Sequence, residues 1–195
     1  DVLEYVLAPN VDGSPISDRS VAVTLAVLLR KVAARQLGIE TRELGFATQN
    51  VRLHGHQGLA VLLYDAISGG AGYSSSLEGH AASLLKAAIE EAANCPANCD
   101  TSCPECLLSH DTRDVAMLLD RSKLIEVLGE TFTGALVVPQ SAKEMVGEDA
   151  AWESRALRDA ILDELRHGGN EIWIFDSGDH QLQEGSYAIK LFDRI

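Results

Sequence analysis

The distribution of cysteines is the feature that most constrains this chain. All four fall within twelve residues, in the pattern C-x3-C-x3-C-x2-C, at Cys95, Cys99, Cys103 and Cys106. Structural cysteines usually scatter among core positions, so this clustering indicates a metal site. Zinc takes four thiolates in a tetrahedron, and C-x2-C is the spacing of a zinc knuckle. The sequence therefore predicts Zn²⁺ held by a short loop.

Four other interpretations of the cysteines stay open at this point. Disulfides suit small secreted domains, and nothing here indicates secretion. A four-iron cluster is possible, although the spacing departs from the ferredoxin run C-x2-C-x2-C-x3-C. A catalytic zinc would need an open position, with His110 replacing one cysteine. The thiols could also form a redox switch through reversible disulfides.

The composition is that of one soluble domain, or one domain with a small appendage. The chain has 195 residues, of which 46% are hydrophobic and 23% are charged, which excludes a disordered tail, a collagen repeat and a coiled coil. The longest apolar stretch, residues 21–29, is about half of the ~20 residues needed to cross a membrane. With no initiating Met and no leader, we expect a cytoplasmic piece excised from a longer polypeptide.

Charge is distributed unevenly along the chain. The net charge of −13 arises after residue 60, because residues 1–60 are neutral while residues 61–128 carry −6 and residues 129–195 carry −7. Nucleic-acid affinity depends on Lys and Arg neutralising phosphates, so the two later segments should repel DNA. The candidates for DNA contact are Arg30, Lys31 and Arg35, although their sequence context favours a solvated helix face.

Hydrophobic periodicity predicts an α/β (α+β) protein, with helices packed on a small mixed sheet. A helix over residues 19–37 is the firmest element, with Asp18 or Ser17 as N-cap and Gly38 as its end. The other predicted elements are strands at 1–8 and 59–64, a hairpin-like polar stretch after Phe46, and helices at 77–93 and 115–128. Residues 129–195 are expected to form a short βαβ-like appendage, with strands at 135–138, 171–175 and 187–192 and a helix at 152–166.

A glycine-rich turn follows the predicted strand at 59–64. Strand, glycine turn and helix is the order of phosphate-binding loops, but this turn has no Lys and matches neither G-x-x-x-x-G-K-[ST] nor G-x-G-x-x-G. We therefore favour a structural turn with positive φ angles. Asp65 and Tyr73 would be its hydrogen-bonding supports.

These motifs together resemble the MrfA zinc-binding (MZB) family. The resemblance rests on YDAISGGAGY at residues 64–73, the four cysteines ending in CPEC at 103–106, and Leu119-Asp120-Arg121, and it covers about residues 1–128. The family occurs in superfamily 2 DNA helicases, including a mitomycin-repair type, and in DrmB of the DISARM anti-phage system.

The resemblance implies an accessory, non-catalytic domain that stabilises a helicase and helps it to engage DNA and assemble with partners. The helicase core would lie in the same polypeptide or in a partner subunit, and the setting would be DNA repair or antiviral defence. It implies that the four cysteines bind Zn²⁺. It also implies that the turn supporting them consists of Asp65, Gly69, Gly70, Gly72 and Tyr73. This sequence has no Walker A motif and no DExH box, so we expect no ATP hydrolysis by this chain alone and no association with membranes.

An enzyme is the competing hypothesis. A hydrolase or nuclease could use zinc with His110, or Mg²⁺ with Asp65 and Asp111. The segment NEIWIFDS at 170–177 resembles the opening unit of a phospholipase D-like domain, but the H-x-K-x4-D motif of that family is absent.

Overall fold

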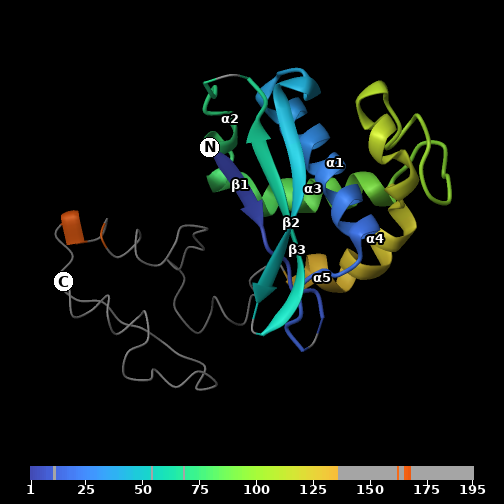
Figure 1. Ribbon diagram of the computed structural model, residues 1–195, viewed down its shortest axis with the longest axis horizontal. Coiled ribbons are helices and arrows are strands. Elements are labelled where there is room, and N and C mark those ends of the chain that lie inside the picture. Colours follow the sequence, from blue (N-terminus) through green and yellow to red (C-terminus); the bar gives the residue numbers. More distant parts are fainter. Residues whose placement is uncertain (11, 54, 68, 136–161, 163–164, 168–195) are drawn as a thin grey trace. The chain divides into compact units, whose positions relative to one another are not determined.

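The computed structural model describes residues 1–10, 12–53, 55–67, 69–135, 162 and 165–167 (Figure 1). The chain divides into two units, Asp1–Trp152 and Glu153–Ile195, and the helices and strands given below lie in the first. The strands predicted at 171–175 and 187–192 lie outside the described residues. So do residues 136–138 of the strand predicted at 135–138 and most of the predicted helix at 152–166. The predicted division after residue 128 stays a prediction.

Helix α1, Arg19–Leu37, is the centre of the fold and has the predicted bounds. The Asp18 carboxylate accepts the Ser20 amide at 2.7 Å, and Gly38 ends the helix with a φ of 68°. Every residue from Val21 to Leu29 is buried. A helix that is apolar on all sides must be enclosed by other elements, and α1 contacts strands of the sheet and the helices α3 (Ala81–Ala93) and α4 (Arg121–Leu128).

The sheet has three strands in the order β1-β3-β2. They are β1 (Val2–Tyr5), β2 (Leu44–Leu53) and β3 (His56–Asp65), and both pairings are antiparallel. The sequence predicts a mixed sheet and places the last strand only at 59–64. The structure instead has a long β2–β3 hairpin, because the polar strand β2 pairs along its whole length with β3.

The remaining helices follow the sheet in the chain: α2 (Tyr73–Ser76), α3 (Ala81–Ala93), α4 (Arg121–Leu128) and α5 (Glu130–Ala135). The strand prediction at 135–138 is wrong for Ala135, which is the last residue of α5. Short 3₁₀ helices, Glu78–His80 and His110–Leu118, precede α3 and α4. The predicted helix at 115–128 is interrupted because Asp120 is extended and caps α4, its carboxylate accepting the Lys123 amide at 3.1 Å.

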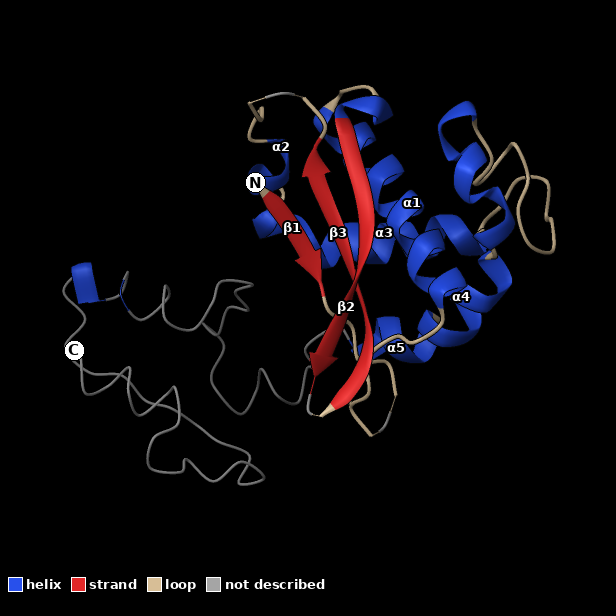
Figure 2. Cartoon of the chain, viewed as in Figure 1, coloured by secondary structure: helices blue, strands red, loops and turns tan. Residues whose placement is uncertain are grey.

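The helices and the sheet share one core. Val61 and Leu63 of β3 face α1 with at most 1% of their surface exposed, and Leu84, Leu124 and Leu128 close the other side of α1. Figure 2 shows α1 and α4 on the same side of the strands. The predicted class, helices on a small sheet with a four-cysteine loop, is confirmed. In the part of the chain that the structure describes, no helix is long and apolar enough to cross a membrane.

Candidate metal centre

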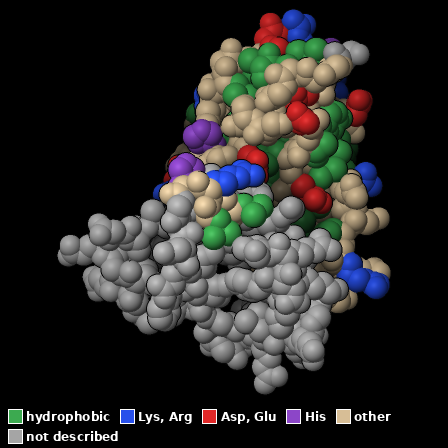
Figure 3. Space-filling model, turned by 90° about the vertical axis from the view of Figure 1, so that its left-hand side faces the viewer, with side chains coloured by type: hydrophobic (Ala, Val, Ile, Leu, Met, Phe, Trp, Pro, Cys, Tyr) green, Lys and Arg blue, Asp and Glu red, His purple; other side chains and the backbone are tan. Residues whose placement is uncertain are grey.

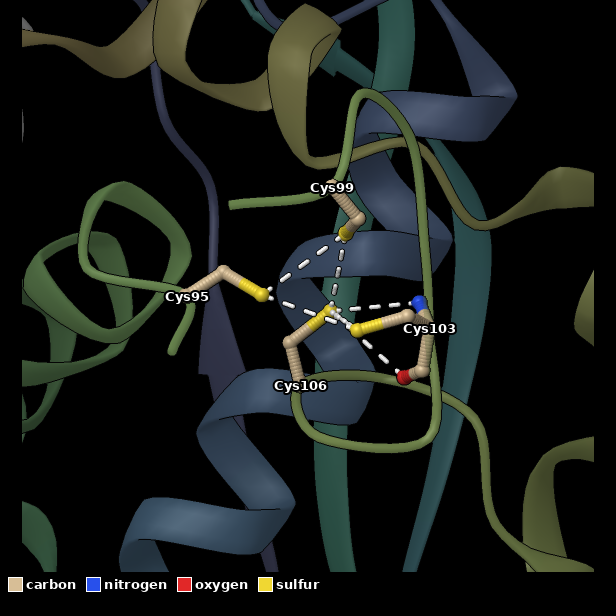
Figure 4. A group of neighbouring side chains, drawn as sticks. All are labelled: Cys95, Cys99, Cys103 and Cys106. Atoms are coloured by element: carbon tan, nitrogen blue, oxygen red, sulfur yellow. Dashed lines mark hydrogen bonds between the residues drawn. The ribbon is translucent and has the colours of Figure 1, made fainter. Parts of the chain in front are cut away.

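The four cysteines lie in a loop, residues 94–109, between α3 and the 3₁₀ helix His110–Leu118. Cys95 and Cys106 are buried, while Cys99 and Cys103 are half-buried. The backbone bends tightly here: the Cys103 carbonyl accepts the amides of residues 106, 107 and 108 at 2.9–3.1 Å. These turns direct all four side chains toward one another (Figure 4).

The sulfur positions have the dimensions of a tetrahedral metal site. The Sγ–Sγ distances are 3.7 Å for Cys95–Cys99 and 3.6 Å for Cys95–Cys103, Cys99–Cys106 and Cys103–Cys106. All four sulfurs lie within 4.8 Å of one another. A tetrahedron with zinc–sulfur bonds of about 2.3 Å has edges of about 3.8 Å. The four cysteines are free thiols, and together they could hold one metal ion.

Protonation of the thiols is uneven. Hydrogen bonding from the Cys99 backbone lowers the pKa of Cys95 to about 6, whereas burial raises the pKa of Cys99 to about 12 and also raises the pKa of Cys106. Thiolates this close repel one another, so they share protons in the absence of a cation. A divalent cation would offset that repulsion, and soft thiolates select zinc, copper(I) or iron–sulfur chemistry.

Arg121, the first residue of α4, connects the cysteine loop to the end of α3 through hydrogen bonds. Its Nε donates to the Ala92 carbonyl at 2.6 Å, its Nη2 to the Ala93 carbonyl at 2.9 Å, and its Nη1 to the Cys99 carbonyl. The Arg121 amide also donates to the Thr101 carbonyl at 2.8 Å. This role of Arg121 is not apparent from the sequence, where Arg121 stands out only as the last residue of the Leu119-Asp120-Arg121 motif.

Lys31 of α1 hydrogen-bonds to the other end of the same loop. Its Nζ donates to the Cys106 carbonyl at 2.9 Å and pairs with Glu91 of α3 at 2.7 Å. Arg35 pairs with the second oxygen of Glu91 at 2.8 Å. The loop is thus held from α1 and α4 as well as by its own turns.

The predicted basic patch is not an open cationic surface. Arg30 is only 8% exposed and stacks on the Phe46 ring at 4.8 Å from its centroid, and burial lowers its pKa. Lys31 and Arg35 are both engaged by Glu91. On the face shown in Figure 3, lysines and arginines lie scattered among acidic and apolar side chains. The Arg30 side chain packs inward rather than lying on an open surface, and contact of Arg30, Lys31 or Arg35 with DNA stays a prediction.

The glycine-rich turn wraps the carboxylate of Asp65 itself. Asp65 Oδ2 accepts the amides of Ala71, Gly72 and Tyr73 at 2.7, 2.7 and 3.2 Å, and Oδ1 accepts the amide and hydroxyl of Ser74, each at 2.9 Å. Positive φ angles make this possible: 91° at Gly69, 71° at Gly70 and 77° at Gly72. A ring of amides is an anion site, and here the chain's own aspartate is the anion.

This turn does not touch the cysteine loop directly. It precedes α3, whereas the cysteines follow α3, a helix of 13 residues and therefore about 20 Å long. Tyr73 instead donates its hydroxyl to Glu43 at 3.2 Å. The implied support of the cysteines by Asp65, Gly69, Gly70, Gly72 and Tyr73 stays a prediction; among the described residues, α3 connects the two segments along the chain.

Asp65→Asn is expected to destabilise the chain by about 1–2 kcal/mol at pH 7, because an amide NH₂ would face amide donors. Partial burial alone would raise the pKa of Asp65, but hydrogen bonds from Ser74, Ala71 and Gly72 lower it to about 2 from 3.8. A depressed pKa stabilises the folded state above pH 4 and ceases to do so as the pH falls toward 2. Urea unfolding of both proteins across this range should show the difference between them shrinking with acidity.

Both proteins in that comparison keep the cysteine loop, so acid release of a metal affects them equally. Asp114→Asn, at an exposed position, is the control. A difference that does not change with pH would contradict the assignment of Asp65 as a charged acceptor.

The residues of the enzyme hypothesis are not assembled into a site. His110 is 83% exposed, and its Nδ1 lies 3.9 Å from the adjacent Asp111 carboxylate. Asp111 meets Thr41, while Asp65 is enclosed by the glycine turn. Among the residues described, the grouping that could hold a metal consists of the four cysteines alone.

Comparison with known proteins supports the interpretation of the cysteine loop. Residues 25–107 match the model of the family described as MZB, the MrfA Zn-binding domain, which confirms the resemblance over that segment. Druantia protein DruE of Escherichia coli (strain UMEA 4076-1) is 31% identical over 137 residues, covering 68% of this chain and 7% of DruE. The crystal structure of the DUF1998 helicase MrfA bound to DNA is similar over 60% of this chain and 15% of that one, with 18% identity and a TM-score of 0.41. The chain thus spans a small part of either protein, and the predicted likeness to DrmB stays a prediction.

Proposed function

We propose that this chain, an MZB domain over residues 25–107, is a zinc-stabilised accessory module of a helicase-related protein and performs no chemistry of its own. The observation that carries the proposal is the closed set of four sulfurs, with neighbouring Sγ atoms 3.6–3.7 Å apart. Four protein ligands complete the tetrahedral coordination of zinc, whereas a catalytic zinc keeps one position for water. Cys95, Cys99, Cys103 and Cys106 are the proposed ligands.

The proposed role of zinc is to join α3 to α4. The loop between them, residues 94–109, contributes few apolar side chains to the core, so thiolate–metal bonds would supply the stability that packing does not. A firmly held loop gives the rest of the protein a fixed surface for assembly. Engagement of DNA belongs, in this proposal, to the larger assembly, because residues 61–195 of this chain are strongly acidic.

We place the parent protein among the cytoplasmic helicase-associated proteins of DNA repair or anti-phage defence. The family match and the relationship to a Druantia protein support this placement. The helicase core would lie elsewhere in the same polypeptide or in a partner subunit.

Metal analysis of the purified chain tests the proposal. We expect one zinc per chain by emission spectrometry, and the cobalt-substituted protein should show the absorption of a tetrahedral site with four thiolates. Iron, or cobalt bound by three sulfurs and a water, would contradict the assignment. Mass spectrometry that finds two disulfides in the native chain would contradict it as well, in favour of a redox switch.

A further inference from the structure

Arg30 has an unusual environment for a buried cation. It is 8% exposed, and its Nε is buried with no hydrogen-bond partner among the residues the structure describes. The Phe46 ring lies 4.8 Å, at its centroid, from the guanidinium carbon. A buried polar nitrogen without an acceptor is costly, so the Nε of Arg30 calls for an acceptor that the described part of the protein does not supply.

A small cavity lies beside this guanidinium. It has a volume of about 150 Å³, and its polar lining consists of Arg30, Lys31, Thr41, Ser109 and Thr112. Drug-sized ligands need about 300 Å³ or more, so a nucleoside is too large. At about 30 Å³ per water, the space suits one small anion with a water or two.

Asp111, an acidic residue that interacts electrostatically with Arg30, forms no close ion pair with it in the described part of the chain. The Asp111 carboxylate meets the Thr41 hydroxyl at 3.4 Å, a long contact that a competing acceptor could replace. Glu91 is already shared by Lys31 and Arg35.

We propose that this cavity binds a single phosphate group. The planar fork of a guanidinium matches two phosphate oxygens, and the hydroxyls of Thr41 and Ser109 are donors for the remaining oxygens. The ammonium of Lys31 also lines the cavity, although Glu91 already offsets much of its charge. The group belongs either to free phosphate or to a nucleic-acid strand whose remainder stays outside. The phosphate site does not use the metal, although Pro104, the proposed zinc ligand Cys106, Leu107 and Leu108 form part of its wall.

Calorimetric titration of the whole metal-loaded chain with inorganic phosphate tests the site. We expect saturable binding that Arg30→Met weakens at least about tenfold, because the charged hydrogen bonds are lost. Methionine keeps an apolar stem against Phe46, so the melting temperature without phosphate should be unchanged or higher. Arg52→Gln, which removes one exposed cation from β2, is the matched control and should bind phosphate as the original chain does.

Two oligonucleotides, one with a 5′-phosphate and one with a 5′-hydroxyl, distinguish the sources. Competition by the phosphorylated strand alone assigns a nucleic-acid end, and competition by both assigns the backbone. If neither competes while inorganic phosphate binds, the ligand is the free ion.

The proposal is overturned if the original chain shows no saturable phosphate binding, if Arg30→Met binds normally, or if Arg52→Gln weakens binding as much. A fall in melting temperature for Asp111→Asn in phosphate-free buffer, without phosphate binding by the original chain, would show instead that Asp111 is the partner of Arg30. Zinc content is measured for every variant, so failure of the zinc site is distinguished from failure of the phosphate site.

Discussion

Cys106→Ser is expected to release the metal and lower the melting temperature by about 10 °C or more, because the binding energy of a structural zinc is also folding energy. Cys106 is 4% exposed and its sulfur lies 3.6 Å from those of Cys99 and Cys103. The Cys103 amide also donates to it at 3.3 Å. Serine keeps the volume but replaces a soft thiolate with a hydroxyl. Circular dichroism melts and metal analysis of the same samples provide the measurement.

The original chain treated with a chelator should melt like Cys106→Ser, and the chelator should not change the variant further. Ser102→Ala, in the same loop, is the matched control for a serine-sized change and should keep its zinc. A Cys106→Ser protein with a full complement of zinc and an unchanged melting temperature would show that the four sulfurs are not the ligands.

Helix α1 shows how much of the fold local sequence can specify. Its cap at Asp18, its end at Gly38 and its apolar interior are all local signals, and the observed bounds, Arg19–Leu37, are those predicted. Strand β2 shows the limit. Its sequence, LGFATQNVRL, has little strand character of its own, and its conformation depends on pairing with β3 across the hairpin.

The start of α3 and the interruption before α4 were predicted less well for a related reason. The helical periodicity begins at residue 77, but α3 begins only at Ala81, because Glu78–His80 form a 3₁₀ turn. The apolar pattern also continues through Leu119, yet Asp120 is drawn out of the helix because its amide donates to Thr24 of α1 at 2.9 Å. That contact joins residues 96 positions apart, which no window of local sequence contains.

The candidate site divides in the same way. Four cysteines in twelve residues are a local pattern, so the metal-binding loop is visible in the sequence. The residues that hold the loop are not, because Lys31 and Arg121 reach it from positions 75 and 22 residues away. Likewise, Arg30 appears on a basic stretch of sequence as a surface residue, and only the packing of α1 against β2 turns it inward.

The two side chains that hold the loop, Lys31 and Arg121, contribute differently to its stability. Lys31 is 37% exposed in its side chain and its pairing with Glu91 is partly solvated, so its effect on stability is limited. Arg121 is 8% exposed, and it donates hydrogen bonds to carbonyls of both α3 and the loop. The last turn of a helix leaves carbonyls without partners, and a cation there is favoured by the helix dipole. Arg121 therefore satisfies the end of α3 and positions the cysteine loop with one side chain.

Arg121→Met is expected to destabilise the chain by about 3 kcal/mol, because the carbonyls of Ala92, Ala93 and Cys99 lose their charged donors and Ala92, at least, is buried. Urea unfolding measures the loss. A chromogenic chelator should also extract zinc faster from the variant, because the loop that carries Cys99 is no longer tied to α3. The stability and the rate of zinc extraction of Arg121→Lys should lie between those of the original chain and of Arg121→Met, since one ammonium cannot reach all three carbonyls at once.

Lys123→Met is the matched control on the same helix. Lys123 lies 3.7 Å from Asp18 with 51% of its side chain exposed, so its loss should cost less than about 1 kcal/mol and leave zinc release unchanged. Equal effects of the two methionine substitutions would mean that Arg121 contributes only general charge to α4. A destabilised Arg121→Met protein with normal zinc release would mean that Arg121 completes the end of α3 but does not hold the metal loop. The combination of lower stability and faster release is what the three carbonyl contacts require.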